Sequence, residues 1–307
     1  MKKPPHPDKP IYFLLPRYWF TWLGLGVLYL VAQLPYPWQI NIGRAMGKLA
    51  YRIMRDRRHI ADVNLRLCFP EKTSEQRRAL IKKNFESVGI GLIEMGMAWW
   101  TPQNKIATIG HVNGLENLNA ALAQGKGAIM LCAHFTTLEI TARIIGRHMA
   151  IRTIYREQKN RLFNAVMERH RRQIVAGIIH RKDTRGMIKS LKQNVPIYYA
   201  GDQDYGKKHS IFVPFFGVQA ATITGMLRLA AMTGAPIIPS THYRIDKKPY
   251  YVITLHPALE NFPTGDDEKD LLRINQIVEN MIVEKPEQYY WIHRRFKTRP
   301  EGEARPY

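Results

Sequence analysis

Residues 127–139 read GAIMLCAHFTTLE, and this stretch decides the fold that we expect for the chain. The apolar run 127–132 has the length and composition of a short buried strand. His134 follows the run, and Glu139 comes five residues later, where a helix is expected to begin. Side chains at the carboxyl ends of strands form the active sites of α/β sheets. An imidazole at that edge, oriented by a carboxylate, is what deprotonation of a hydroxyl requires.

The same alternation of strand and helix continues outward from this stretch, from about residue 106 to the C-terminal region. It predicts an α/β fold in which helices cover a sheet. The expected strands are 127–132, 151–155, 174–179, 195–200, 236–240 and 250–255. The expected helices are 137–148, 160–172, 184–193, 222–233 and 267–284. Residues 40–100 are expected to be helical, with a capped helix start at Ser74.

An uncharged stretch lies near the N-terminus: residues 18–43 contain no Asp, Glu, Lys, Arg or His. Residues 18–34 are nearly all apolar, close to the roughly 20 residues that a bilayer-spanning helix needs. Tyr and Trp residues flank this segment, as they do at membrane interfaces, and the basic residues that follow indicate a cytoplasmic side. We therefore expect a membrane helix over 18–34, with a buried core helix as the alternative. Residues 1–10 are Pro-rich and basic and are expected to form a tail.

The composition is strongly basic, with 46 Lys and Arg against 25 Asp and Glu and a net charge of +21. Such a charge attracts nucleic acid, acidic lipids, acidic proteins or phosphorylated substrates. The sequence has no zinc finger, RRM or KH signature, so we expect no nucleic-acid partner. Its two cysteines, Cys68 and Cys132, form no CxxC motif. We expect neither a disulfide scaffold nor a metal site, and no cofactor.

The His134 region predicts a reaction as well as a fold. Glu139 is expected to hold one ring nitrogen of His134, so that the other nitrogen accepts a proton from an attacking hydroxyl. The chain has no Gly-x-Ser-x-Gly nucleophile elbow, and Cys132 belongs to the buried strand pattern. A substrate hydroxyl is therefore expected to attack a carbonyl directly, without an acyl-enzyme.

Three further segments supply candidate binding residues. The basic segment 152–189 is either a solvated helix face or an anion cradle, in which one Arg could also stabilise an oxyanion. The turn GDQDYG at 201–206 lacks the ligand series of an EF-hand metal loop, so its acids are expected to orient a neighbouring Arg or His. Asp202 lies nearer the strand end and is favoured as the site residue, with Asp204 as a turn cap. The apolar loop 210–217 either lines a hydrocarbon channel or belongs to the core.

Several stretches together resemble the late (secondary) acyltransferases of lipid A biosynthesis, of the lauroyl/myristoyl type, within the lysophospholipid-acyltransferase-like superfamily. His134-x-x-x-x-Glu139 matches the family's His-x-x-x-x-Asp/Glu motif. The other similar stretches are NLRLCFP at 64–70, YR at 155–156, RKDTRGMI at 181–188, DQDYG at 202–206, VPFFG at 213–217 and YWIHRRFKTRP at 290–300. One departure is Asn160-Arg161, because the family often has Asn-Pro there. The loop before 162–172 is therefore expected to differ in shape.

The resemblance implies a glycerolipid-acyltransferase-like fold with a central mixed sheet flanked by helices. It implies transfer of an acyl chain from acyl-carrier protein to a hydroxyl of a hydroxyacyl chain on an anionic, Kdo-bearing lipid A precursor. The enzyme would sit in the inner membrane with its catalytic domain on the cytoplasmic face. The chain would consist of a tail and membrane anchor at 1–36 and one acyltransferase domain at 37–307. This domain would have a helical part (40–105) and an α/β part (106–307).

By motif position, His134 would be the catalytic base and Glu139 its partner, with Arg171 and Asp202 as further catalytic residues. Substrate binding is expected to involve Arg156, Lys159, Arg172 and Tyr205. Two alternatives stay open. The acceptor could be another membrane lipid, such as a glycerophospholipid or an ornithine lipid, or the chain could be a basic, membrane-tethered binding protein without catalysis.

Overall fold

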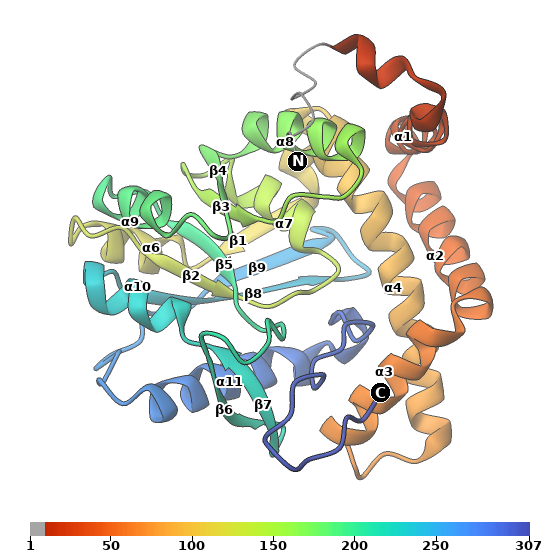
Figure 1. Ribbon diagram of the computed structural model, residues 1–307. Coiled ribbons are helices and arrows are strands. Elements are labelled where there is room, and N and C mark those ends of the chain that lie inside the picture. The colour runs from red at the N-terminus through yellow and green to blue at the C-terminus, as the bar shows by residue number, and fades with distance from the viewer. Residues whose placement is uncertain (1–9) are drawn as a thin grey trace, which may run out of the picture.

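A seven-stranded mixed sheet forms the centre of the computed structural model, which describes residues 10–307 (Figure 1). The strand order is β1-β9-β8-β2-β5-β3-β4. All neighbouring strands pair in parallel except β8 and β9, which are antiparallel. The strands are β1 (Gly110–Asn113), β2 (Ile129–Cys132), β3 (Arg152–Tyr155), β4 (Gly177–His180), β5 (Ile197–Ala200), β8 (Ile237–Arg244) and β9 (Tyr251–Leu255). The expected mixed sheet flanked by helices is confirmed.

Helices cover both faces of the sheet because its strands are apolar on both sides. In β2, Ile129 and Leu131 point into one core and Met130 and Cys132 into the other, as the two-residue period of a strand requires. In Figure 1, α7 and α8 lie above the sheet and α11 lies below it. The helices of the α/β part are α6 (Leu115–Leu122), α7 (Leu138–Ile145), α8 (Arg161–Ile174), α9 (Thr184–Lys192), α10 (Gly225–Thr233) and α11 (Asp267–Glu284).

The loop 210–217, left open from the sequence, belongs to a two-stranded hairpin outside the main sheet. β6 (Ser210–Phe215) pairs antiparallel with β7 (Val218–Ile223). Val213 and Phe215 are fully buried, and Asn275 of α11 donates a hydrogen bond of 2.7 Å to the carbonyl of Pro214. The apolar side chains of this hairpin therefore fill the core between it and α11, rather than lining a channel.

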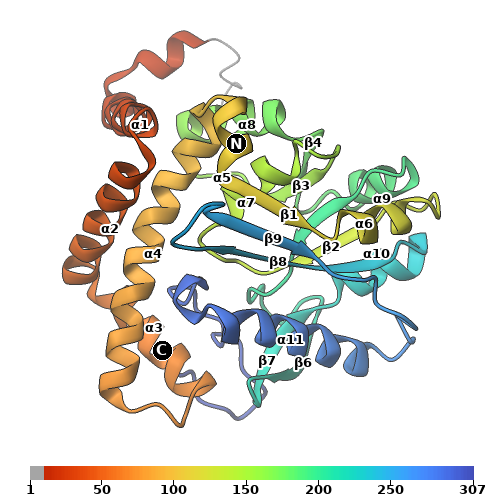
Figure 2. The same cartoon turned by 180° about the vertical axis from the view of Figure 1, so that it is seen from behind.

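The N-terminal third consists of helices packed at one side of the sheet, with the long helix α4 between the sheet and α1 and α2 (Figures 1 and 2). These helices are α1 (Trp19–Ala32), α2 (Tyr36–Ile53), α3 (Arg55–Cys68), α4 (Ser74–Trp100) and α5 (Gln103–Ile109). The cap of α4 is Thr73, one residue before the expected Ser74, and it forms a capping box with Gln76. Gly43 and Gly47 of α2 meet Gly89 of α4 with their backbones in contact.

The expected membrane helix over 18–34 is not supported. Within residues 10–307, no helix combines the length and the apolarity needed to cross a bilayer. The apolar run forms α1, which has 14 residues against the roughly 20 that a spanning helix needs. The chain leaves the helix at Gln33, and Pro35 caps the start of α2. The tail predicted for residues 1–10 lies, up to residue 9, outside the described residues.

Candidate active site

A histidine–aspartate pair occupies the carboxyl edge of the sheet. β2 and β5 are adjacent and parallel, with Cys132 opposite Ala200, so the residues two positions further on, His134 and Asp202, meet. Nδ1 of His134 lies 2.6 Å from Oδ1 of Asp202. The backbone N–H of His134 also donates to both carboxylate oxygens, at 3.2 and 3.1 Å. One contact therefore holds the imidazole, and two hold the His134 backbone, against the same carboxylate.

The buried carboxylate of Asp202 is held in its charged form. Burial alone would raise its pKa, but the positive charge that His134 can carry has the opposite effect. Hydrogen bonds from the ring and backbone of His134, and from Tyr289, act in the same direction. The net result is a pKa well below the usual range, so Asp202 is an anion at neutral pH. An anion on Nδ1 sets the tautomer in which Nε2 can accept a proton.

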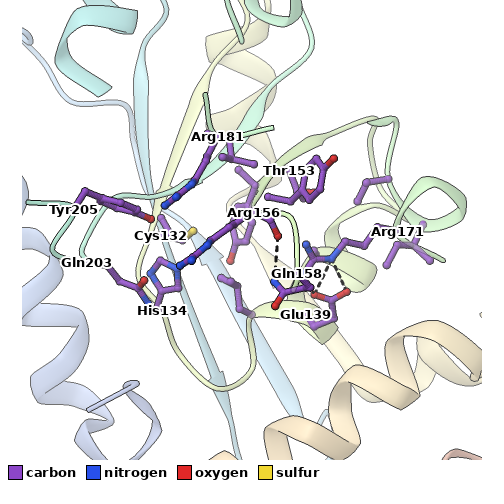
Figure 3. A pocket seen from close by; sticks show the side chains of 18 residues that line it. Cys132, His134, Glu139, Thr153, Arg156, Gln158, Arg171, Arg181, Gln203 and Tyr205 are labelled. Carbon is purple, nitrogen blue, oxygen red and sulfur yellow. Dashed lines mark hydrogen bonds and ion pairs between the residues drawn. The ribbon is translucent and has the colours of Figure 1, made fainter. Parts of the chain in front are cut away.

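Glu139 does not hold the ring of His134, which corrects the expectation from the sequence. Its carboxylate accepts hydrogen bonds from Arg171, at 2.9 Å from Nε and 2.6 Å from Nη2, and from Trp99 Nε1 at 2.9 Å. Glu139 lies in the first turn of α7, where its side chain points toward α8 and α4 (Figure 3). The Glu139–Arg171 pair thus joins α7 to α8, and Asp202 takes the place at His134 that Glu139 was expected to fill.

A pocket of about 310 Å³ opens beside His134 between the strand ends, α7 and α8. Its mouth is polar and cationic, and Figure 3 shows Arg156 and Arg181 pointing toward His134 and Tyr205. The mouth residues are Arg156, Gln158, Arg181, Gln203 and Tyr205. The buried residues of the lining are mostly apolar and comprise Cys132, Ala142, Thr153, Ile174, Val175 and Tyr198.

Residues 7–298 match the family described as bacterial lipid A biosynthesis acyltransferase. The chain belongs to this family. It is 46% identical over 291 residues to the lipid A biosynthesis lauroyltransferase of Escherichia coli (strain K12), which covers 94% of this chain and 95% of that relative. It is 40% identical to the palmitoleoyltransferase of the same organism, over 96% of both chains. It is 30% identical to the myristoyltransferase, over 96% of this chain and 92% of that one.

The predicted binding residues of this acyltransferase are only partly brought together. Arg156 and Tyr205 line the His134 pocket. Arg172 instead borders a neighbouring hollow and lies 3.7 Å from Glu168. Lys159 is exposed in the loop before α8 and lines neither cavity. Arg171 lines the His134 pocket, and Arg172 points elsewhere because successive residues of a helix do not share one face.

The loop that carries His134 is held from two sides by residues that sequence reasoning did not assign to the site. The C-terminal segment pairs with it through Tyr290 N–H to the His134 carbonyl (2.9 Å) and Thr136 N–H to the Gln288 carbonyl (2.8 Å). On the other side, the hydroxyl of Thr137 lies 2.8 Å from Nδ1 of the buried His242. In the sequence, the only indication that the C-terminal segment matters was the family-like stretch 290–300. That stretch does not show which residues it contacts.

A second support reaches the same loop from α4. The hydroxyls of Ser87 and Thr136 lie 2.8 Å apart, and Arg244 donates to Ser87 at 2.7 Å. Arg244 also pairs with the buried Glu94, to which the Tyr251 hydroxyl donates at 2.8 Å.

Within residues 10–307, His, Cys, Asp and Glu side chains form no group of three suited to hold a metal ion.

Proposed function

We propose that this acyltransferase moves a fatty acyl chain from acyl-carrier protein to a hydroxyl of a hydroxyacyl chain on a Kdo-bearing lipid A precursor. The observation that carries the proposal is the His134–Asp202 pair, 2.6 Å apart, at the mouth of a pocket with a cationic rim and a buried apolar end. An ester-forming transfer needs a base for the hydroxyl, a place for an acyl chain and cations for anionic substrates. The pocket provides a candidate group for each.

In the proposed reaction, Nε2 of His134 takes the proton of the acceptor hydroxyl as its oxygen attacks the thioester carbonyl. The tetrahedral intermediate collapses with cleavage of the carbon–sulfur bond, and the proton passes from His134 to the leaving thiolate. The products are an ester and a free thiol, and the enzyme returns to its starting state. Asp202 stabilises the imidazolium that forms in between. Arg156, which points toward His134, is our candidate for stabilising the oxyanion.

A covalent acyl-enzyme is not needed in this scheme, and Cys132 is poorly suited to form one. Burial raises the pKa of its thiol well above the usual value, so the reactive thiolate is suppressed. Glu139 and Arg171 are positioning residues in the proposal. Their ion pair sets the spacing of α7, which follows the His134 loop, and α8 across the pocket.

The proposed site of action is the cytoplasmic face of the inner membrane. Helices α1 and α2 expose large apolar side chains that would suit the interfacial region of a bilayer. The most exposed are Trp19, Phe20, Leu23, Leu30, Trp38, Leu49 and Ile53. Lys48 and Arg52 of α2 are exposed along the same helix and would meet anionic headgroups. The net charge of +21 favours both the anionic lipid and an acidic carrier protein.

The test is a mass comparison of lipid A from cells with and without the gene, together with transfer by the purified enzyme from acyl-carrier protein to the lipid A precursor. The proposal expects one additional acyl chain, esterified to a hydroxyacyl group, only when the gene is present. An ester found instead on a glycerol hydroxyl or on an ornithine lipid would show that the acceptor is a different membrane lipid. Absence of any acyl transfer would overturn the proposal.

A further inference from the structure

The His134 pocket has two chemically different ends. The mouth carries exposed or half-exposed polar groups, among them Arg156 and Tyr205. The opposite end is formed by buried residues of α7, α8 and the sheet. A cavity that runs from a reactive histidine into buried apolar walls takes a ligand that is polar at one end and apolar at the other.

The apolar end lies one helical turn beyond the Glu139–Arg171 ion pair. Val175 is the extended residue that ends α8. Ala142 follows Glu139 by three residues on α7, and Ile174, the last residue of α8, follows Arg171 by three. Residues at these spacings share a helix face. The ion pair therefore joins the two helices, and the three apolar residues close the pocket one turn farther along both helices. Thr153 and Tyr198, which pair across β3 and β5, form its base on the sheet.

We infer that this apolar end holds the acyl chain of the donor, and that Ala142 sets the length of chain that is transferred. The inference rests on the proposed function, since it takes the attacked carbonyl to lie beside His134. The chain that continues from this carbonyl cannot lie among the arginines of the mouth without burying cations against methylene groups. It enters the buried end instead, where its last carbon meets Ala142 and Val175.

The side chain of Ala142 is small among these walls, which makes it the position where an added volume shortens the pocket most directly. One methylene more or less in a hydrophobic pocket changes selectivity by roughly 10- to 200-fold. Related enzymes are named for different acyl groups: the lauroyltransferase is 46% identical to this chain, the palmitoleoyltransferase 40% and the myristoyltransferase 30%. A shared site with one variable wall would account for such differences.

The experiment gives the full-length enzyme a mixture of decanoyl, lauroyl, myristoyl and palmitoyl carrier protein with one acceptor, and reads the acyl composition of the product by mass spectrometry. Ala142→Leu is expected to shift the preferred chain to a shorter one, with at least a ~10-fold change in the ratio of long to short product. Val175→Ala is expected to shift the preference to a longer chain. The matched control is Ala120→Leu, the same exchange at an exposed position of α6, which should leave the composition unchanged.

An unchanged acyl composition in active Ala142→Leu enzyme would overturn the inference. If Ala142→Leu does not fold, Val175→Ala decides alone, and an unchanged profile there has the same meaning. A second arm offers acceptors whose hydroxyacyl chains differ in length, with one donor. A change of preference in this arm alone would assign the pocket to the acceptor and overturn the inference. Failure of the parent enzyme to acylate the precursor at all would instead contradict the proposed function.

Discussion

Asp202 lies 2.6 Å from Nδ1 of His134, although 68 residues separate the two in the chain. The contact depends on the pairing of β2 with β5, which brings two strand ends side by side. Asp202 also accepts the backbone N–H of His134, so it positions the loop as well as the ring. Of the two acids predicted for this site, Asp202 is therefore the one that contacts His134.

We predict that Asp202→Asn and His134→Ala each lower kcat at least ~100-fold, the lower range for loss of a general base. The amide keeps the shape of Asp202 but not the charge that stabilises an imidazolium. Initial rates with saturating donor and acceptor measure the effect. Asp183→Asn, which replaces an exposed helix cap with another good cap, is the control and should retain normal turnover. Normal turnover in Asp202→Asn would show that the charge of Asp202 is not needed to orient His134 or to stabilise its imidazolium.

Glu139 and Arg171 are expected to contribute mainly to stability, because their hydrogen bonds are to each other and to Trp99. Both side chains are largely buried, at 14% and 21% exposed. A double-mutant cycle with Glu139→Ala, Arg171→Ala and both should give a coupling free energy of about 1–3 kcal/mol in urea unfolding. A coupling near zero would show that the ion pair does not tie α7 to α8.

His242 predicts a dependence of stability on pH. Burial lowers its pKa to about 3, so it is neutral in the folded protein, whereas in the unfolded chain its pKa is about 6.5. Between these values the unfolded state binds the extra proton. Acidification from about pH 6 to pH 4 therefore costs up to ~1.4 kcal/mol of stability per pH unit from this residue.

The substitution His242→Asn removes the titrating group and can still accept a hydrogen bond from Thr137. Urea unfolding across this pH range should show a shallower slope for the variant than for the parent. Parallel slopes would mean that His242 is protonated in the folded state as well. His59→Asn is the control, because His59 lies in α3 and is exposed, whereas His242 is buried.

The crossing of α2 and α4 is expected to tolerate no side chain at Gly89. An added Cβ would collide with the backbone of Gly43 and Gly47, and backbone cannot move aside as a side chain does. Gly89→Ala should cost about 1–3 kcal/mol or more in the free energy of unfolding. Gly24→Ala in α1 is the matched control, because the added methyl group meets no atom within 4 Å. It should be neutral or stabilising by about 0.5–1 kcal/mol.

If α1 lies against the bilayer, replacing its most exposed apolar residues should weaken membrane binding. Trp19, Phe20 and Leu23 are 62%, 87% and 65% exposed. The triple serine variant is expected to reduce the fraction that floats with anionic vesicles at least ~10-fold, given the free energy of burying side chains of this size. Met232→Ser in α10 removes an exposed apolar residue elsewhere and should float normally. Equal flotation of the triple variant would exclude α1 as the contact.

The sequence allowed most of the sheet and the place of the candidate site to be predicted, because buried strands appear as apolar runs and His134 follows one. Strand β1 was missed, since residues 110–113 read GHVN and form no apolar run. The hairpin strands were missed as well, because Pro214 interrupts the pattern of β6. Both missed segments lie away from the pocket that the strand ends enclose.

The acids of the 201–206 turn were expected to orient a neighbouring Arg or His, but the carboxylate on the His134 ring was assigned to Glu139, for a physical reason. Nearness in sequence suggested Glu139, but the direction of a side chain in the first turn of a helix is set by what the helix packs on. The order of the strands in the sheet decides which strand ends are neighbours, and this order cannot be derived from the pattern of apolar runs. The membrane helix is not supported for a different reason: the apolar run forms only the 14-residue α1, which ends before Gln33, and α2 begins as a separate helix at Tyr36.

The pairing of Tyr290 with the His134 carbonyl has a consequence for biosynthesis. Residues 288–290 complete the support of a loop that is translated about 150 residues earlier. A nascent chain that has emerged from the ribosome only as far as β9 holds the histidine, the aspartate and the whole central sheet, but not the backbone partners of the loop. The loop therefore gains its full set of backbone partners only near the end of translation, and premature termination before residue 288 should leave an inactive product.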